Sequence, residues 1–194
     1  VKNFDIFKNK KTILRKMTLK PFFHPRSVAV IGASRTPGHV GYVILENFTK
    51  SGFKGKIYSV NPHADEILGV KCFASILDIK EPVELAVVAV PADGVLAVVR
   101  ECGKKGIKHI ILVTAGFTEV GNKKLQDELG KLLQRYGMRC IGPNCLGVFG
   151  TYSGVDTVFI PRERIRRPAS GGLAIVSQSG ALGSTLLDLA SLEF

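Results

Sequence analysis

The feature of this sequence that most constrains its fold is a series of short apolar runs with little alternation of polar and apolar residues. Each run ends near a Gly, Pro or Asn residue. Strands of this kind are buried on both faces of a parallel sheet. The runs are Ser27–Ile31, Lys56–Val60, Leu85–Val90, His109–Val113 and Met138–Ile141.

Helical patterns lie between these runs. Apolar residues recur at helical spacing over residues 40–50, 94–105 and 123–136. Strands that alternate with helices build a parallel sheet covered on both faces. The sequence therefore predicts an α/β fold, specifically a Rossmann-like doubly wound parallel sheet that is complete by about residue 150.

A second, incomplete domain is expected at the end of the chain. Gly172–Val176 again has the pattern of a buried strand, and Leu182–Leu192 that of a helix. We interpret them as the first strand and helix of a second, flavodoxin-like α/β domain. Because one strand and one helix cannot bury a core, we expect this segment to dock irregularly, self-associate or be mobile. The predicted division is 1–20 as a basic extension, 21–150 as the first domain, 151–171 as a linker and 172–194 as the start of the second domain.

The net charge of +11 does not predict a nucleic-acid partner, because most of it lies in residues 1–26 and in the run Arg162–Arg167. No apolar run reaches the roughly 18 residues that a membrane span needs, and no secretory signal is visible. A cytoplasmic protein without a membrane partner is expected. Met17 precedes the first strand, so a natural start there, with residues 1–16 as an extension, is a further expectation.

Ligands of open α/β sheets bind at the carboxyl ends of the strands. The first strand is followed by Gly32, Ser34, Arg35, Gly38 and Gly41 in one loop that leads into a helix. Glycines allow a sharp turn and close backbone approach, and a helix N-terminus offers free N–H groups to a phosphate. The loop is longer than the dinucleotide-binding fingerprint, so a purely structural glycine turn remains open.

The second strand ends in Asn61-Pro62-His63 and not in the Asp or Glu that NAD sites use for the ribose. A ribose that carries a phosphate fits this end better. Coenzyme A (CoA) has a 3′-phosphate and NADP has a 2′-phosphate, so an NADP-dependent oxidoreductase stays open.

Three further loops could carry a long ligand across the strand ends, or could be plain turns. They contain Pro91, Gly116 and Asn144, respectively. The cysteines form no CxxC pair and no metal-ligand spacing, so we expect packing roles and no metal. These cysteines are Cys72, Cys102, Cys140 and Cys145.

The motifs GASRTPGHVG, YSVNP, VAVPA, VTAGFTEVG, IGPNCLGV and AIVSQSGALG follow one another in this chain. In this order they resemble the ADP-forming acetyl- and acyl-CoA synthetases and, more distantly, the α subunit of succinyl-CoA synthetase. The resemblance extends from about Pro21 to Phe194. It departs from the family at His63, where relatives often have a lysine suited to the 3′-phosphate; Lys71 or Lys56 could replace it.

The resemblance implies that CoA or acyl-CoA is the ligand of the first domain. It also implies that the SQSGAL turn faces inorganic phosphate or a phosphohistidine, although Ser179 as an ordinary helix cap remains open. The implied CoA contacts are Gly32, Ser34, Arg35, Gly41, Asn61, Pro62, Pro91, Gly116 and Asn144, and the implied phosphate contacts are Ser179, Gly180 and Ala181.

The reaction implied by the resemblance converts acyl-CoA, phosphate and ADP into the free acid, CoA and ATP. It needs a phosphorylated histidine and an ATP-grasp domain or subunit as partner. The four histidines of this chain match none of the expected positions, so we assign no catalytic residue and expect binding without turnover. A regulatory CoA-binding module, joined to an acetyltransferase or free-standing, is the alternative, and an oligomer is left open. The histidines are His24, His39, His63 and His109.

Overall fold

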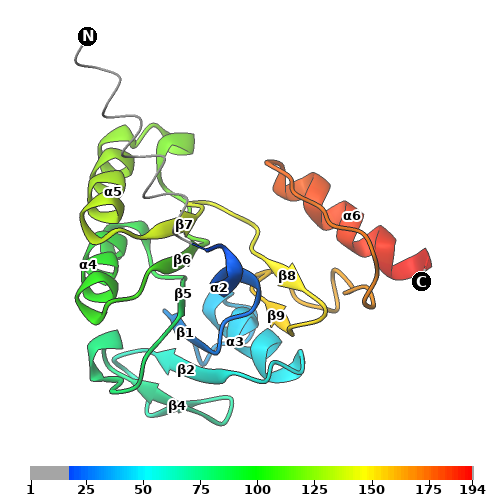
Figure 1. Cartoon of the computed structure of the whole chain (residues 1–194), viewed down its shortest axis with the longest axis horizontal. Helices are drawn as coiled ribbons and strands as arrows, with labels where there is room; N and C mark the ends of the chain where they lie inside the picture. The colour runs from blue at the N-terminus through cyan, green and yellow to red at the C-terminus, as the bar shows by residue number, and fades with distance from the viewer. Residues whose placement is uncertain (1–17, 194) are drawn as a thin grey trace.

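The computed structural model describes residues 18–193. At its centre is a seven-stranded sheet in the order β3-β4-β2-β1-β5-β6-β7 (Figure 1). The basic extension predicted for residues 1–20 lies almost entirely outside the described residues. The strands of the sheet are β1 (Ser27–Ile31), β2 (Lys56–Val60), β3 (Glu66–Ile67), β4 (Val70–Phe73), β5 (Leu85–Val88), β6 (His109–Leu112) and β7 (Arg139–Ile141).

The doubly wound parallel sheet predicted from the apolar runs is confirmed. Strand β1 pairs in parallel with β2 on one side and with β5 on the other, so the strand order reverses beside β1. Strands β6 and β7 continue the parallel sheet beyond β5. The sequence did not reveal the short strands β3 and β4: β4 pairs in parallel with β2, and β3 pairs antiparallel with β4.

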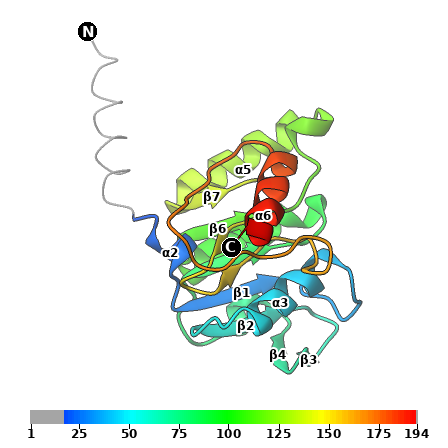
Figure 2. The same ribbon diagram turned by 90° about the vertical axis from the view of Figure 1, so that its right-hand side faces the viewer.

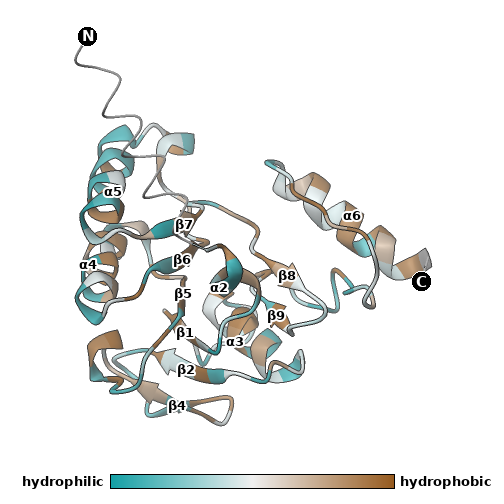
Figure 3. Cartoon of the chain, in the orientation of Figure 1, coloured by the Kyte–Doolittle hydropathy of each residue, from teal (hydrophilic) through white to brown (hydrophobic). Residues whose placement is uncertain are grey.

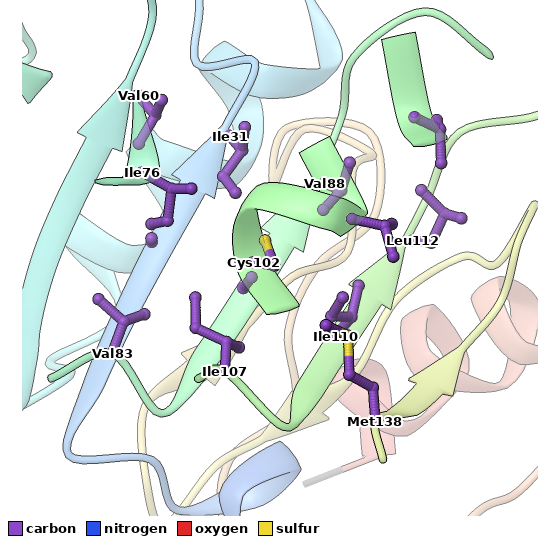
Figure 4. Close-up of a cluster of buried hydrophobic side chains, with 14 of the residues drawn as sticks. Ile31, Val60, Ile76, Val83, Val88, Cys102, Ile107, Ile110, Leu112 and Met138 are labelled. Carbon is purple, nitrogen blue, oxygen red and sulfur yellow. The ribbon is translucent and has the colours of Figure 1, made fainter. Parts of the chain in front are cut away.

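Helices cover both faces of the sheet. Figure 1 shows α4 (Val95–Lys105) and α5 (Lys123–Tyr136) on one face and α3 (Val40–Lys50) on the other. Alternate residues of β1 divide between two clusters: Ala29 and Ile31 pack with α4 and α5, and Val28 and Val30 pack with α3. Figure 4 shows side chains of the first cluster, and Figure 3 shows the apolar colouring of the strands. Three 3₁₀ helices, Ile76–Asp78, Ala92–Gly94 and Thr118–Val120, and the short helix α2 (Lys20–Phe23) complete this part.

Buried structure continues past residue 150 into the predicted linker. Strands β8 (Phe149–Gly150) and β9 (Val155–Asp156) form a small antiparallel pair against α3. Val155 is fully buried, and Asn47 of α3 donates to the carbonyl of Val158 over 2.8 Å. The beginning of the segment that we assigned to a linker is therefore part of the core.

An ion cluster anchors the basic run Arg162–Arg167. The carboxylate of Asp156 is fully buried and accepts from Arg162 Nη2 at 2.8 Å and from Arg167 Nε at 3.0 Å. The Arg167 side chain is only 3% exposed and also donates to the carbonyl of Ile160 over 2.9 Å. The charges of Arg162 and Arg167 are therefore paired inside the protein.

Residues Gly172–Val176 are described by the structure but do not form the predicted strand. The predicted helix after them is present as α6 (Gly180–Glu193). Residues 169–182 are exposed throughout. Figures 1 and 2 show this segment and α6 at the side of the molecule, away from the strands of the main sheet. An apolar strand needs neighbouring strands for its backbone hydrogen bonds, and within residues 18–193 none lies beside this segment.

Candidate functional site

The loops at the carboxyl ends of the strands contact one another. Asn61 Nδ2, after β2, donates to the carbonyl of Ala33, after β1, over 2.7 Å. Thr114 Oγ1, after β6, donates to the carbonyl of Val90, after β5, over 2.7 Å. Asn144, after β7, donates its backbone N–H to the carbonyl of Thr114 over 2.9 Å. The loops therefore form a nearly continuous edge across the switch point of the sheet.

The glycine loop after β1 packs tightly at its base and is open at its tip. A Cβ at Gly41 would lie 1.9 Å from the carbonyl oxygen of Gly32, so α3 can begin against this turn only with glycine at position 41. Ser34 Oγ accepts the N–H of Thr36 over 3.0 Å, and the Arg35 side chain is exposed. The tip of the loop thus offers a hydroxyl and a guanidinium to a ligand.

The N-terminus of α3 has no side-chain cap. His39 occupies the cap position, and its imidazole lies 3.5 Å from Ser34 Oγ without accepting from the helix. Among residues 18–193, the N–H groups of Val40, Gly41 and Tyr42 have no hydrogen-bond partner. Free N–H groups beside an arginine at a sheet switch point are suited to a phosphate or diphosphate.

The end of β2 is organised by Asn61, which sequence analysis expected to contact the ligand. Its amide donates to Ala33, and its Oδ1 accepts the N–H of His63 over 2.8 Å. The next two residues, Pro62 and His63, are exposed. Asn61 therefore shapes this rim, and Pro62 and His63 form its accessible surface.

The loop after β6 holds a residue that sequence analysis missed. Glu119 Oε1 accepts the N–H of Gly116 over 2.6 Å and that of Phe117 over 3.2 Å. Hydrogen bonds from the N–H groups of Gly116, of Glu119 itself and of Phe117 lower the pKa of this carboxyl. Gly116 has φ +110°, and a Cβ there would lie 2.9 Å from the Cβ of Ala92. The sequence signal that could have identified Glu119 is a glutamate three residues after a loop glycine.

The loop after β7 carries Asn144, which is exposed and has φ +52°. Cys145 points inward, where its Sγ donates to the carbonyl of Leu112 over 3.4 Å. Burial raises the pKa of Cys145 to about 11. The thiol is thus protonated at neutral pH and packs as predicted.

The SQSGAL turn is an N-cap of α6. Ser179 Oγ accepts the N–H of Leu182 over 3.2 Å, and Ser177 Oγ accepts the N–H of Ser179 over 3.0 Å. A Cβ at Gly180 would lie 3.7 Å from the Cβ of Leu146. The structure therefore brings this turn beside the loop after β7, with Gly180 and Ala181 exposed.

The remaining predicted contacts lie at the same edge. Pro91 is exposed at the end of β5, next to the 3₁₀ helix Ala92–Gly94. A depression beside it is lined by Asp93, Asn122, Lys124 and Glu128, among others. Within the described part of the chain, no group of three His, Cys, Asp or Glu could hold a metal ion, and no helix is long and apolar enough to cross a membrane.

A doubly wound sheet with an open glycine loop and a free helix N-terminus at its switch point defines a Rossmann-like domain for a phosphate-bearing ligand. The CoA binding domain family matches residues 26–151, which is more than half of the chain. The chain belongs to this family, and CoA is its ligand class.

Relatives with related names extend the comparison. The chain is 46% identical over 178 residues to "Acetate--CoA ligase [ADP-forming]" of Methanocaldococcus jannaschii, covering 92% of this chain and 24% of that protein. It is 42% identical over 183 residues to "Acetate--CoA ligase [ADP-forming] I subunit alpha" of Pyrococcus furiosus, covering 91% and 39%. The chain thus spans between a quarter and two fifths of the length of these relatives.

A solved structure has the same arrangement. The "dinucleotide forming Acetyl-coenzyme A synthetase 1" of Ca. Korarchaeum cryptofilum, in complex with phosphate and ADP, matches with a TM-score of 0.84 and 42% identity. The match covers 91% of this chain and 37% of that chain. The resemblance stated from the motifs is therefore confirmed.

Proposed function

We propose that the chain binds CoA along the carboxyl ends of its strands, with the diphosphate on the loop from Gly32 to Gly41. The observation that carries this proposal is the free N-terminus of α3 beside Arg35. Two negative charges would meet N–H groups, a helix dipole and a guanidinium there. The Ser34 hydroxyl would add a further donor.

The adenosine end would lie toward β2, beside Pro62 and His63. Lys71 of β4 is the better partner for the 3′-phosphate than Lys56. Lys71 is exposed near the carboxyl end of β2, with its Nζ 5.2 Å from the ring centroid of Phe73. Lys56 begins β2, so roughly 13 Å of strand separates it from the site edge.

The rest of CoA would cross the loops after β5, β6 and β7, which carry Pro91, Gly116 and Asn144. Its thiol end would then approach the SQSGAL turn, where Ser179, Gly180 and Ala181 would receive a phosphate. Ser179 can donate its hydroxyl hydrogen to that phosphate while its oxygen still accepts from Leu182.

We infer that this chain corresponds to the CoA-binding part of an ADP-forming acyl-CoA synthetase. In that reaction, phosphate attacks the thioester carbonyl, the C–S bond breaks, and CoA leaves as the thiol. The acyl phosphate transfers its phosphoryl group to a histidine, which releases the acid. The phosphohistidine then transfers the phosphoryl group to ADP, which yields ATP. The chain would hold CoA and phosphate, while the phosphorylated histidine and an ATP-grasp domain or subunit would come from elsewhere. The placement of His109 agrees with this division. That side chain is buried and its Nε2 lies 2.9 Å from the carbonyl of Thr18, so it does not face the proposed phosphate site.

A thermal-shift comparison of CoA, acetyl-CoA, NADPH and NADH tests the ligand. CoA and acetyl-CoA should raise the melting temperature, because a ligand that binds only the folded state stabilises it by mass action. NADH should not, because no carboxylate at the end of β2 receives its ribose. Stabilisation by NADPH or NADH without stabilisation by CoA would overturn the proposal.

A further inference from the structure

The turn after β6 is held by its own side chains. Glu119 receives the N–H groups of Gly116 and Phe117 on one carboxylate oxygen. Asn122 Nδ2 donates to the carbonyl of Gly116 over 3.3 Å. Both backbone polar groups of Gly116 are thus satisfied inside the protein, and the residue is fixed at φ +110°.

This arrangement leaves both backbone polar groups of one residue in the turn open. The carbonyl of Thr114 accepts from Asn144, and the carbonyl of Phe117 accepts from Val120 and Asn122. Ala115 is exposed, and within residues 18–193 its N–H and C=O have no hydrogen-bond partner. Among the described residues of the turn, Ala115 is therefore the one whose N–H and C=O are both free for a ligand, whereas sequence analysis named Gly116.

The strand order sets the direction in which a ligand reaches this turn. β2 lies on one side of β1, and β5 and β6 lie on the other. With the diphosphate at the β1 loop and adenosine beside β2, the rest of CoA must cross β5 and β6. Neighbouring strands are about 4.8 Å apart, so the β6 turn lies roughly 10 Å from the β1 loop. That distance brings the turn to the pantetheine arm, which contains two amide groups.

We propose that Glu119 is a positioning residue that clamps the β6 turn so that the free N–H and C=O of Ala115 bind an amide of the pantetheine arm. This inference rests on the proposed function. The carboxylate does not touch the arm itself; it fixes Gly116 and Phe117 in the conformation that leaves Ala115 exposed. Without the carboxylate, the N–H groups of Gly116 and Phe117 are free and the turn samples other conformations.

The test compares two ligands on the intact chain by calorimetric titration. One is CoA, and the other is 3′-phosphoadenosine 5′-diphosphate, which has the same nucleotide but no pantetheine arm. Glu119→Ala should weaken CoA binding roughly tenfold and leave the affinity for the armless ligand within about twofold. Glu119→Gln keeps an acceptor oxygen and should restore most of the affinity for CoA.

Glu81→Ala is the matched control. Glu81 is an exposed glutamate before β5, at the opposite end of the strands, and its removal should change neither affinity. Equal weakening of both ligands by Glu119→Ala would show a general structural role and overturn the inference, as would unchanged or tighter CoA binding. If Glu119→Ala does not fold, Glu119→Gln provides the test. Weaker binding of CoA with unchanged binding of the armless ligand would support the inference, and the absence of such a selective loss would contradict it. Failure of both ligands to bind the unaltered chain would instead refute the proposed function.

Discussion

Two stretches of similar apolar sequence adopt different structures in this protein: one is a buried strand and the other is exposed. Leu85–Val88 forms the buried strand β5, in which every residue is fully buried. Leu173, Ile175 and Val176 belong to an equally apolar run, yet Val176 is 101% exposed and no strand forms there. β5 lies between β1 and β6, whereas the described residues provide no strand beside 172–176. Apolar sequence therefore favours a strand, but neighbours that take its hydrogen bonds decide whether it forms.

Ion pairs contribute to the connection between the core and α6. Asp156 of β9 pairs with Arg167, and the preceding residue, Arg166, pairs with Asp188 of α6 at 3.5 Å. Ion pairs thus connect the core with α6 in two steps. The Asp156–Arg167 pair is buried, whereas the Arg166–Asp188 pair is largely exposed. The two pairs should therefore contribute differently to the free energy of unfolding.

Hydrogen exchange should show the largest difference between the two regions. Amides of β6, such as Ile110, are expected to exchange at least roughly 10⁴-fold more slowly than those of Ala174–Val176, because β6 opens only with the whole domain. Mass spectrometry of peptides covering both segments measures this ratio. Strong protection of Ala174–Val176 in a monomeric sample would mean that the segment has found a core, and the comparison would fail.

Asp156→Ala should be the most damaging substitution at the junction. It leaves the buried Arg167 guanidinium without its carboxylate, and the expected loss is about 4 kcal/mol in the free energy of unfolding. Urea denaturation followed by circular dichroism measures it. A loss below about 1 kcal/mol would show that solvent reaches Arg167 and that the cluster is not an anchor.

Matched isoleucines test the comparison directly. Ile110→Ala empties a fully buried site in β6 and should cost about 3 kcal/mol. Ile175→Ala, at a residue 44% exposed, should change stability by less than about 0.5 kcal/mol. The same denaturation experiment applies to both variants. Equal losses would mean that residues 172–176 pack as tightly as the main sheet in solution.

Asp188→Ala should have the smallest effect. Its pair with Arg166 is exposed on both sides, and such pairs contribute about 0.5 kcal/mol or less. The variant is the control for Asp156→Ala, since it removes a carboxylate from the outer link only. Faster exchange in α6 without a change in the unfolding of the main sheet is expected; a loss as large as that of Asp156→Ala would place α6 within the core.

Some functional positions were readable from the sequence and others were not. The glycine loop was predicted because Gly32 and Gly41 follow a strand and precede a helix, which is a local pattern. The local pattern at Ser179 left a helix cap and a phosphate contact open, and no local pattern revealed that Asn61 uses its amide to join two loops. Each of these assignments depends on where a side chain points.

The sequence by itself determined the five parallel strands and the helices between them, because continuous apolar runs and helical spacing report burial directly. It also determined the order of the loops that follow these strands. Only the tertiary structure decided that Asp156 is buried between Arg162 and Arg167, that Glu119 clamps the β6 turn, and that Gly172–Val176 is not a strand. These outcomes depend on partners that come together only when the chain folds, and a charged or apolar residue carries no local sign of whether such a partner will be there.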